Sequence, residues 1–191
     1  GSFQNALDVL GQVPKGQELQ RLYLSWRCRM ALGQEREALA LANEVAGLAP
    51  KSAVSLYLQG KAAAARGDAK NAEALFRSSC QADPGFAPPW VGLAIMHRER
   101  GERREALDLA EKGFVLAPLQ LSTLALFHSL AEEMEALPRE EERVREACLI
   151  YPEHKGLSFG LVEVLIRQGH YLQAMDEIER AAVGFGLDDA G

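Results

Sequence analysis

Residues 53–84 read AVSLYLQGKAAAARGDAKNAEALFRSSCQADP, and the fold class can be predicted from this segment. Two runs of helix-forming residues lie on either side of Gly67, and small or apolar residues recur in both runs at helical spacing. Gly67 suits the left-handed conformation that ends a first helix. Pro84 stops a second helix, because the residue before a proline disfavours the helical conformation. The stretch therefore predicts a helix–turn–helix unit.

The unit recurs along the chain with a period of 34 residues and no insertion or deletion. Such a period is the sequence signature of a stacked array of repeats. Three ladders of residues share it: Pro50, Pro84, Pro118 and Pro152; Gly33, Gly67, Gly101 and Gly169; and Ala38, Ala72, Ala106 and Ala174.

On these residues the chain resembles the tetratricopeptide-repeat family, whose unit is two antiparallel helices. The match is close over 53–84 and 87–118, looser over 19–50 and 155–186, and weakest over 121–152. The resemblance implies an all-α fold, a right-handed superhelical α-solenoid of antiparallel helix pairs.

The expected organisation is a single array over 3–186. Residues 1–2 have the look of an expression scar, and 187–191 form a tail. A helix over 3–13 is expected to be the second helix of a further unit, as in a fragment trimmed from a longer array. Five repeats follow it, at 19–50, 53–84, 87–118, 121–152 and 155–186.

The fourth repeat departs from the pattern, because Glu135 and Glu140 replace the ladder glycine and alanine. Pro138 suits the first turn of a helix, so we expect the helix pair to survive with a turn unlike the others. Six glutamates between 132 and 142 form an acidic cluster, for which a solvated face is expected. The alternative is a docking patch for a basic partner or for a neighbouring copy of the chain.

Charge and cysteine usage limit the class of partner. The net charge of −6 divides into 12 Lys and Arg against 9 Asp and Glu up to residue 100, and 9 against 18 after it. No basic stripe could neutralise many phosphates, so nucleic acid is disfavoured, and no apolar run is long enough to span a membrane. Cys28, Cys80 and Cys148 are isolated, which mildly favours the cytoplasm. A periplasmic location stays open if a leader or anchor was removed.

Candidate chemistry is sparse. No hydrolase, zinc-protease, P-loop or dinucleotide motif occurs. His97 and His128 are one unit apart on first helices, but no carboxylate or thiol lies at ligand spacing beside both, so half-buried structural histidines are expected rather than a metal pair. Neither a catalytic site, a metal nor a cofactor is predicted, and the chain is not expected to be an enzyme.

The most informative pattern lies on the first helices, which line the concave face in the tetratricopeptide-repeat family. Tyr23 and Arg27 are an aromatic residue and a cation four residues apart, and Tyr57 and Lys61 repeat this pair one period later. On stacked helices the two pairs should form neighbouring rows. Ala125, Ser129 and Glu163 continue these rows towards a mildly acidic end. The predicted partner-binding residues are Tyr23, Arg27, Tyr57, Lys61, Val91, Ile95 and Phe159.

The predicted function is a protein–protein interaction scaffold that holds a partner segment in its concave groove. An acidic-hydrophobic segment is the expected ligand, and a larger bacterial assembly, secretion or envelope protein is the expected context. The carboxylate-clamp type of groove is disfavoured because the corresponding positions contain no asparagine. Two alternatives stay open: self-assembly through oppositely charged ends, and a regulatory array attached to an enzyme.

Overall fold

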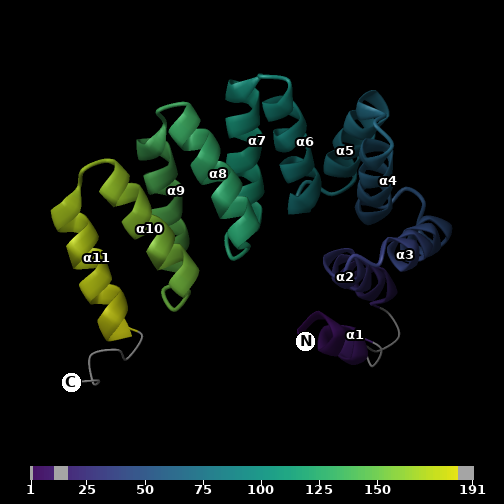
Figure 1. Cartoon of the computed structure of the whole chain (residues 1–191), viewed down its shortest axis with the longest axis horizontal. Coiled ribbons are helices and arrows are strands. Elements are labelled where there is room, and N and C mark those ends of the chain that lie inside the picture. The colour runs from purple at the N-terminus through teal and green to yellow at the C-terminus, as the bar shows by residue number, and fades with distance from the viewer. Residues whose placement is uncertain (1, 11–16, 185–191) are drawn as a thin grey trace. The chain divides into compact units, whose positions relative to one another are not determined.

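The structure, a computed structural model, describes residues 2–10 and 17–184, which form helices, turns and no strand. After α1, helices alternate as antiparallel pairs (Figure 1). The helices are α1 Ser2–Leu10, α2 Glu18–Ala31, α3 Glu35–Leu48, α4 Ala53–Ala65, α5 Ala69–Ala82, α6 Ala87–Glu99, α7 Arg103–Leu116, α8 Leu121–Glu133, α9 Leu137–Ile150, α10 Lys155–Arg167 and α11 Tyr171–Gly184. The prediction of an all-α solenoid of helix pairs is confirmed for these residues.

The proline ladder sets where four of the second helices end. Helices α3, α5, α7 and α9 each stop two residues before a ladder proline. The residue between has left the helical conformation in every case, as at Asp83, with φ −147° and ψ 99°. The cause is the steric clash between a proline ring and a helical residue before it.

The glycine ladder sets the turn inside each pair. Gly33, Gly67, Gly101 and Gly169 have φ between 70° and 79°. At Gly67 the next residue's amide, that of Asp68, donates to the carbonyl of Ala63 at 3.0 Å, which closes the helix.

The fourth repeat forms the same turn, so the expectation of a different one is wrong. Glu135 takes the left-handed conformation, with φ 54°. The amide of Ala136 donates to the carbonyl of Ala131 at 2.7 Å, the bond made at the glycine turns. Hydrogen bonding and packing of the helix pair outweigh the strain of about 1–2 kcal/mol that a side chain brings to this conformation. Pro138 occupies the first turn of α9, as predicted.

Contacts divide the chain into two compact units, Gly1–Pro89 (unit 1) and Trp90–Gly191 (unit 2), with the boundary in the first turn of α6. Each is described by itself. Alanines of the ladder are buried in both units, which lets the paired helices approach closely. Around them pack large side chains, such as Leu22 and Leu58 in unit 1 and Phe114 and Phe127 in unit 2.

The predicted N-terminal helix over 3–13 corresponds to α1, which spans Ser2–Leu10. Residues 11–13 of that prediction, and the predicted tail, lie outside the described residues. The single array over 3–186 stays a prediction.

Candidate functional site

In unit 1 the two predicted tyrosines lie side by side on successive first helices. The ring centroids of Tyr23 on α2 and Tyr57 on α4 are 6.2 Å apart in an edge-to-face arrangement. Trp26 stacks on Tyr23 at 6.2 Å, and Phe86 meets both tyrosine rings at 5.4 and 5.7 Å. Phe76 of α5 closes the group against Tyr57 at 5.7 Å. We call these five residues the aromatic cluster.

The aromatic cluster is partly structural. Both tyrosines are half-buried, and burial raises the pKa of each phenol above its ordinary value. Trp26 and Phe86 were not among the predicted partner-binding residues, and Phe86 lies in the connection between α5 and α6, outside the three ladders. Edge-to-face contacts of this kind add about 0.5–1.5 kcal/mol per pair, so the cluster stabilises unit 1 and fixes the ring positions.

The two predicted cations are exposed beside this cluster. The guanidinium carbon of Arg27 lies 5.9 Å from the centroid of the Tyr23 ring, which is cation–π range. Lys61 is exposed on α4, one repeat period after Arg27. Both charges are therefore available on the surface of unit 1.

In unit 2 the three predicted apolar residues differ in their exposure. Val91 on α6 is half-buried and packs against Gly113 of α7. The contact is close, since a Cβ added to Gly113 would lie 2.8 Å from Cγ2 of Val91. Ile95, one turn further along α6, is 42% exposed, and Phe159 on α10 is 67% exposed. Phe159 and Ile95 therefore present apolar surface to solvent, whereas Val91 contributes mainly to packing.

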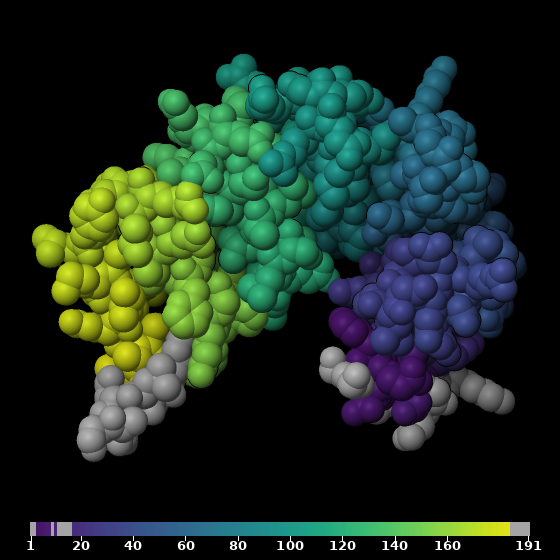
Figure 2. Space-filling view, viewed as in Figure 1, coloured from purple at the N-terminus to yellow at the C-terminus, as the bar shows by residue number. Residues whose placement is uncertain are grey.

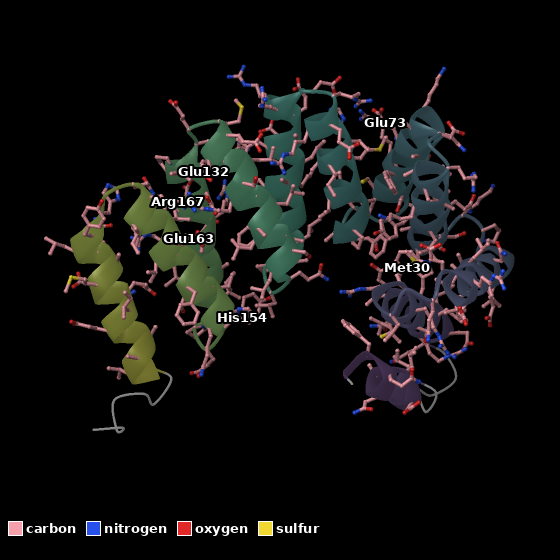
Figure 3. The ribbon with its side chains drawn as sticks, viewed as in Figure 1. Met30, Glu73, Glu132, His154, Glu163 and Arg167 are labelled. Carbon is pink, nitrogen blue, oxygen red and sulfur yellow. The ribbon has the colours of Figure 1, made fainter. Side chains whose placement is uncertain are left out.

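A chain of ion pairs joins α8 to α10 (Figure 3). Arg167 pairs with Glu132 of α8 and, at 3.1 Å, with Glu163 of its own helix. Arg98 of α6 likewise pairs with Glu133 and donates to the Ser129 hydroxyl at 2.9 Å. Glu163, the acidic residue of the row that was predicted to be mildly acidic, is thus paired with Arg167.

The acidic cluster between 132 and 142 is not the uniform solvated face that was expected. Glu140 is completely buried, and its carboxylate contacts Nδ1 of His128 at 2.9 Å. Glu141 pairs with Arg145 at 2.8 Å. Burial would raise the pKa of Glu141, but the pKa is lowered because the contact with Arg145 stabilises the carboxylate. The run is not uniformly solvated because α8 contributes His128 to Glu140, and Arg145 of α9 itself pairs with Glu141.

Both histidines considered as metal ligands have carboxylate neighbours within their own unit. His97 is 7% exposed, with Nδ1 at 2.7 Å from Glu102. Among the described residues, no group of three or more His, Cys, Asp or Glu side chains could hold a metal ion. His154 has a local function that the sequence did not reveal, since its ring accepts a hydrogen bond from the amide of Leu157 at the start of α10.

Comparisons with known proteins show the fold. TTC0263, a thermophilic TPR protein of Thermus thermophilus, has a TM-score of 0.62 at 17% identity, over 86% of this chain and 91% of that one. Pseudomonas aeruginosa PilF has a TM-score of 0.61 at 13% identity, over 88% and 77%. A chain of the APC/C hetero-tetramer Cut9–Hcn1 has 0.62 at 15% identity, over 95% and 35%. Neither a protein-family model nor a curated protein sequence matches the chain.

The chain thus has the tetratricopeptide-repeat fold, as the ladders predicted. None of the described helices has the length and apolar character that crossing a membrane requires.

Proposed function

We propose that this protein is a scaffold that binds a segment of a partner protein through the exposed faces of its first helices. The observation that carries the proposal is the pairing of fixed aromatic rings with exposed cations in unit 1. Tyr23 and Tyr57 are held by the aromatic cluster, and Arg27 and Lys61 are exposed beside them. Rings that are already ordered lose little entropy on binding, which favours them as anchors.

The chemistry of this surface favours an acidic-hydrophobic segment. An apolar side chain of the ligand would lie against the exposed parts of the tyrosine rings, and a carboxylate would meet Arg27 or Lys61. In unit 2, Phe159 and Ile95 offer further apolar contacts of the same kind. A larger bacterial assembly, secretion or envelope complex is the proposed context.

Docking through the acidic cluster has less support. Glu140 is buried, and Glu132, Glu133 and Glu141 already pair with arginines of unit 2. A basic partner would have to compete with these pairs. Partner binding through the first helices is therefore the favoured function.

The test starts with a displayed library of random peptides selected for binding to the parent chain. Dissociation constants of the selected peptides are then measured for the parent and for the variant Arg27→Ala/Lys61→Ala. Both side chains are exposed, so the variant should fold normally. We expect binding to weaken by about tenfold or more, as for interface anchors.

The matched control is Arg36→Ala/Lys70→Ala, which removes two exposed cations from the second helices α3 and α5. Its affinity should equal that of the parent. Equal losses in the two variants would mean that net charge, and not the first-helix surface, drives binding, and the proposal would then be abandoned.

A further inference from the structure

A pocket of about 460 Å³ lies between α9, α10 and α11 in unit 2. Helix α10 packs against both of the other helices, and these three helices run from green to yellow at one end of unit 2 in Figure 2. The described residues that line the pocket include none of the predicted partner-binding residues, so it is separate from the first-helix surface. Its volume falls within the range of about 300–1,000 Å³ that is usual for ligand sites.

The pocket is explained by side chains that are smaller than their equivalents one repeat earlier. The three pocket residues are Cys148, Ser158 and Leu161, and the residues 34 positions before them are Phe114, Leu124 and Phe127. The earlier residues are 1%, 8% and 0% exposed, and the two phenylalanine rings stack at 5.6 Å. The equivalent place between α7, α8 and α9 is therefore filled by side chains of these helices themselves. What the pocket lacks, by comparison, is an aromatic ring.

A buried carboxylate lies in the wall of the pocket. Glu177 on α11 is 5% exposed, and it pairs with Arg180 one turn later. The first three repeats have a leucine at this position, namely Leu41, Leu75 and Leu109. The repeat therefore does not require a carboxylate here for its packing. A carboxylate accepts several hydrogen bonds and donates none, so Glu177 favours a ligand group that donates one.

The charges around the pocket balance, which favours a neutral ligand. Arg145 and Arg180 line the pocket together with Glu153 and Glu177. Burial raises the pKa of Cys148 to about 11, so its thiol is uncharged near neutral pH. A ligand with a full charge of either sign would meet a like charge in this wall, whereas a neutral hydrogen-bond donor would not.

From the shape, the buried carboxylate and the balanced charges we propose that this pocket binds the phenol of a tyrosine side chain from a partner protein. The ring occupies the place that Phe114 fills one repeat earlier, against Cys148 and Leu161. The phenol hydroxyl donates a hydrogen bond to the carboxylate of Glu177. Tyrosine combines an apolar ring with a neutral donor at its tip, and it is a frequent anchor of protein interfaces.

The test titrates the full chain with p-cresol, which is the tyrosine side chain alone, and with toluene, which is the phenylalanine side chain alone. Amide chemical shifts in proton–nitrogen correlation spectra locate the bound ring and give the dissociation constants. We expect shifts at the residues of α9, α10 and α11 that line the pocket. Toluene should bind about tenfold more weakly than p-cresol, because it lacks the hydrogen bond to a charged group. N-acetyltyrosinamide, whose ring is attached to a backbone, should bind at least as tightly as p-cresol.

Two variants separate the contribution of the ring from that of the hydrogen bond. Cys148→Phe/Ser158→Leu places the residues of the preceding repeat in the pocket and should abolish the binding of both probes. Glu177→Leu introduces the leucine of the first three repeats and should weaken p-cresol binding about tenfold while leaving toluene binding unchanged. The repeat accommodates these residues at these positions, so the helical signal and melting temperature should be retained. The matched control Ser122→Leu/Ile150→Phe enlarges two exposed side chains that do not line the pocket and should bind like the parent.

The inference is wrong if Cys148→Phe/Ser158→Leu binds p-cresol as the parent does, or if toluene binds the parent as tightly as p-cresol. It is also wrong if N-acetyltyrosinamide does not bind, because the pocket would then accept only free phenols. A chain that ends at Gly184 should bind p-cresol like the parent, and tighter binding would assign the pocket to residues 185–191 instead. Cys148→Phe alone, with the same expected loss, replaces the double variant if that variant fails to fold.

Discussion

The Nδ1 atom of His128 on α8 lies 2.9 Å from Oε1 of Glu140 on α9, and Glu140 is completely buried. Glu140 occupies the ladder position at which the other repeats have a buried alanine. A carboxylate at this depth requires a partner, and His128 supplies it. The pair therefore connects the two helices of the fourth repeat at its centre.

Removing only the histidine should be costly. We expect His128→Ala to lower the free energy of unfolding by about 3 kcal/mol, because it leaves a buried carboxylate without its partner. The double variant His128→Ala/Glu140→Ala reproduces Ala94 and Ala106 of the preceding repeat and should lie within about 1 kcal/mol of the parent. Urea denaturation followed by circular dichroism measures both. A double variant as unstable as the single one would show that the ion pair is not the cause.

Stability should depend on pH through the same pair. The hydrogen bond with Glu140 raises the pKa of His128 above 6.5, and burial raises that of Glu140 above 4.5. A raised pKa in the folded state stabilises the protein below the ordinary value, and this contribution is lost as the pH rises through the folded-state value. For His128 the loss therefore begins above about pH 6.5.

The measurement is the urea midpoint between about pH 6 and pH 8.5, the range in which histidines and cysteines ordinarily titrate. The other three histidines and the cysteines are present in both the parent and the double variant, so the difference between the two curves reports the His128–Glu140 pair. The midpoint of the parent should fall across this range more steeply than that of His128→Ala/Glu140→Ala. Parallel curves for the two proteins would assign the pH dependence to other groups.

The fourth turn offers a stabilising substitution. Glu135 has φ 54°, a conformation in which glycine has no steric cost, so Glu135→Gly should raise the free energy of unfolding by about 0.5–1 kcal/mol. The reverse change Gly101→Ala should lower it by about 1 kcal/mol from the backbone alone, because an added Cβ there meets nothing within 4 Å. Thermal melting measures the two shifts, which should have opposite signs.

A larger side chain at a ladder alanine should overpack the contact between the paired helices. Ala72 and Ala106 have no exposed surface, so replacing either with leucine should cost about 1–3 kcal/mol. Ala74→Leu, at an exposed position of α5, is the control and should be nearly neutral. Chemical denaturation measures the free energy of unfolding of the three variants. If Ala72→Leu leaves it unchanged, the paired helices do not make their close contact at Ala72.

Most helix ends could be predicted from the glycine and proline ladders alone. Pro84 and Gly67 act through backbone sterics between neighbouring residues, so their effect can be read from the chain without knowledge of its folding. The 34-residue period then implied stacked pairs, because one such unit cannot bury its apolar face alone. The positions of Tyr23 and Tyr57 on successive first helices followed from the same period.

Which side chains are buried and which charges are paired could not be predicted from the chain and follows from the packing of its helices. Glu140 belonged to an acidic run in the sequence, yet it lies in the core because α8 brings His128 against it. Phe86 joined the aromatic cluster from a turn, and Val91 turned towards Gly113. Burial and ion pairing depend on atoms contributed by distant segments, whereas backbone conformation at a glycine or a proline depends on the residue itself and its neighbours.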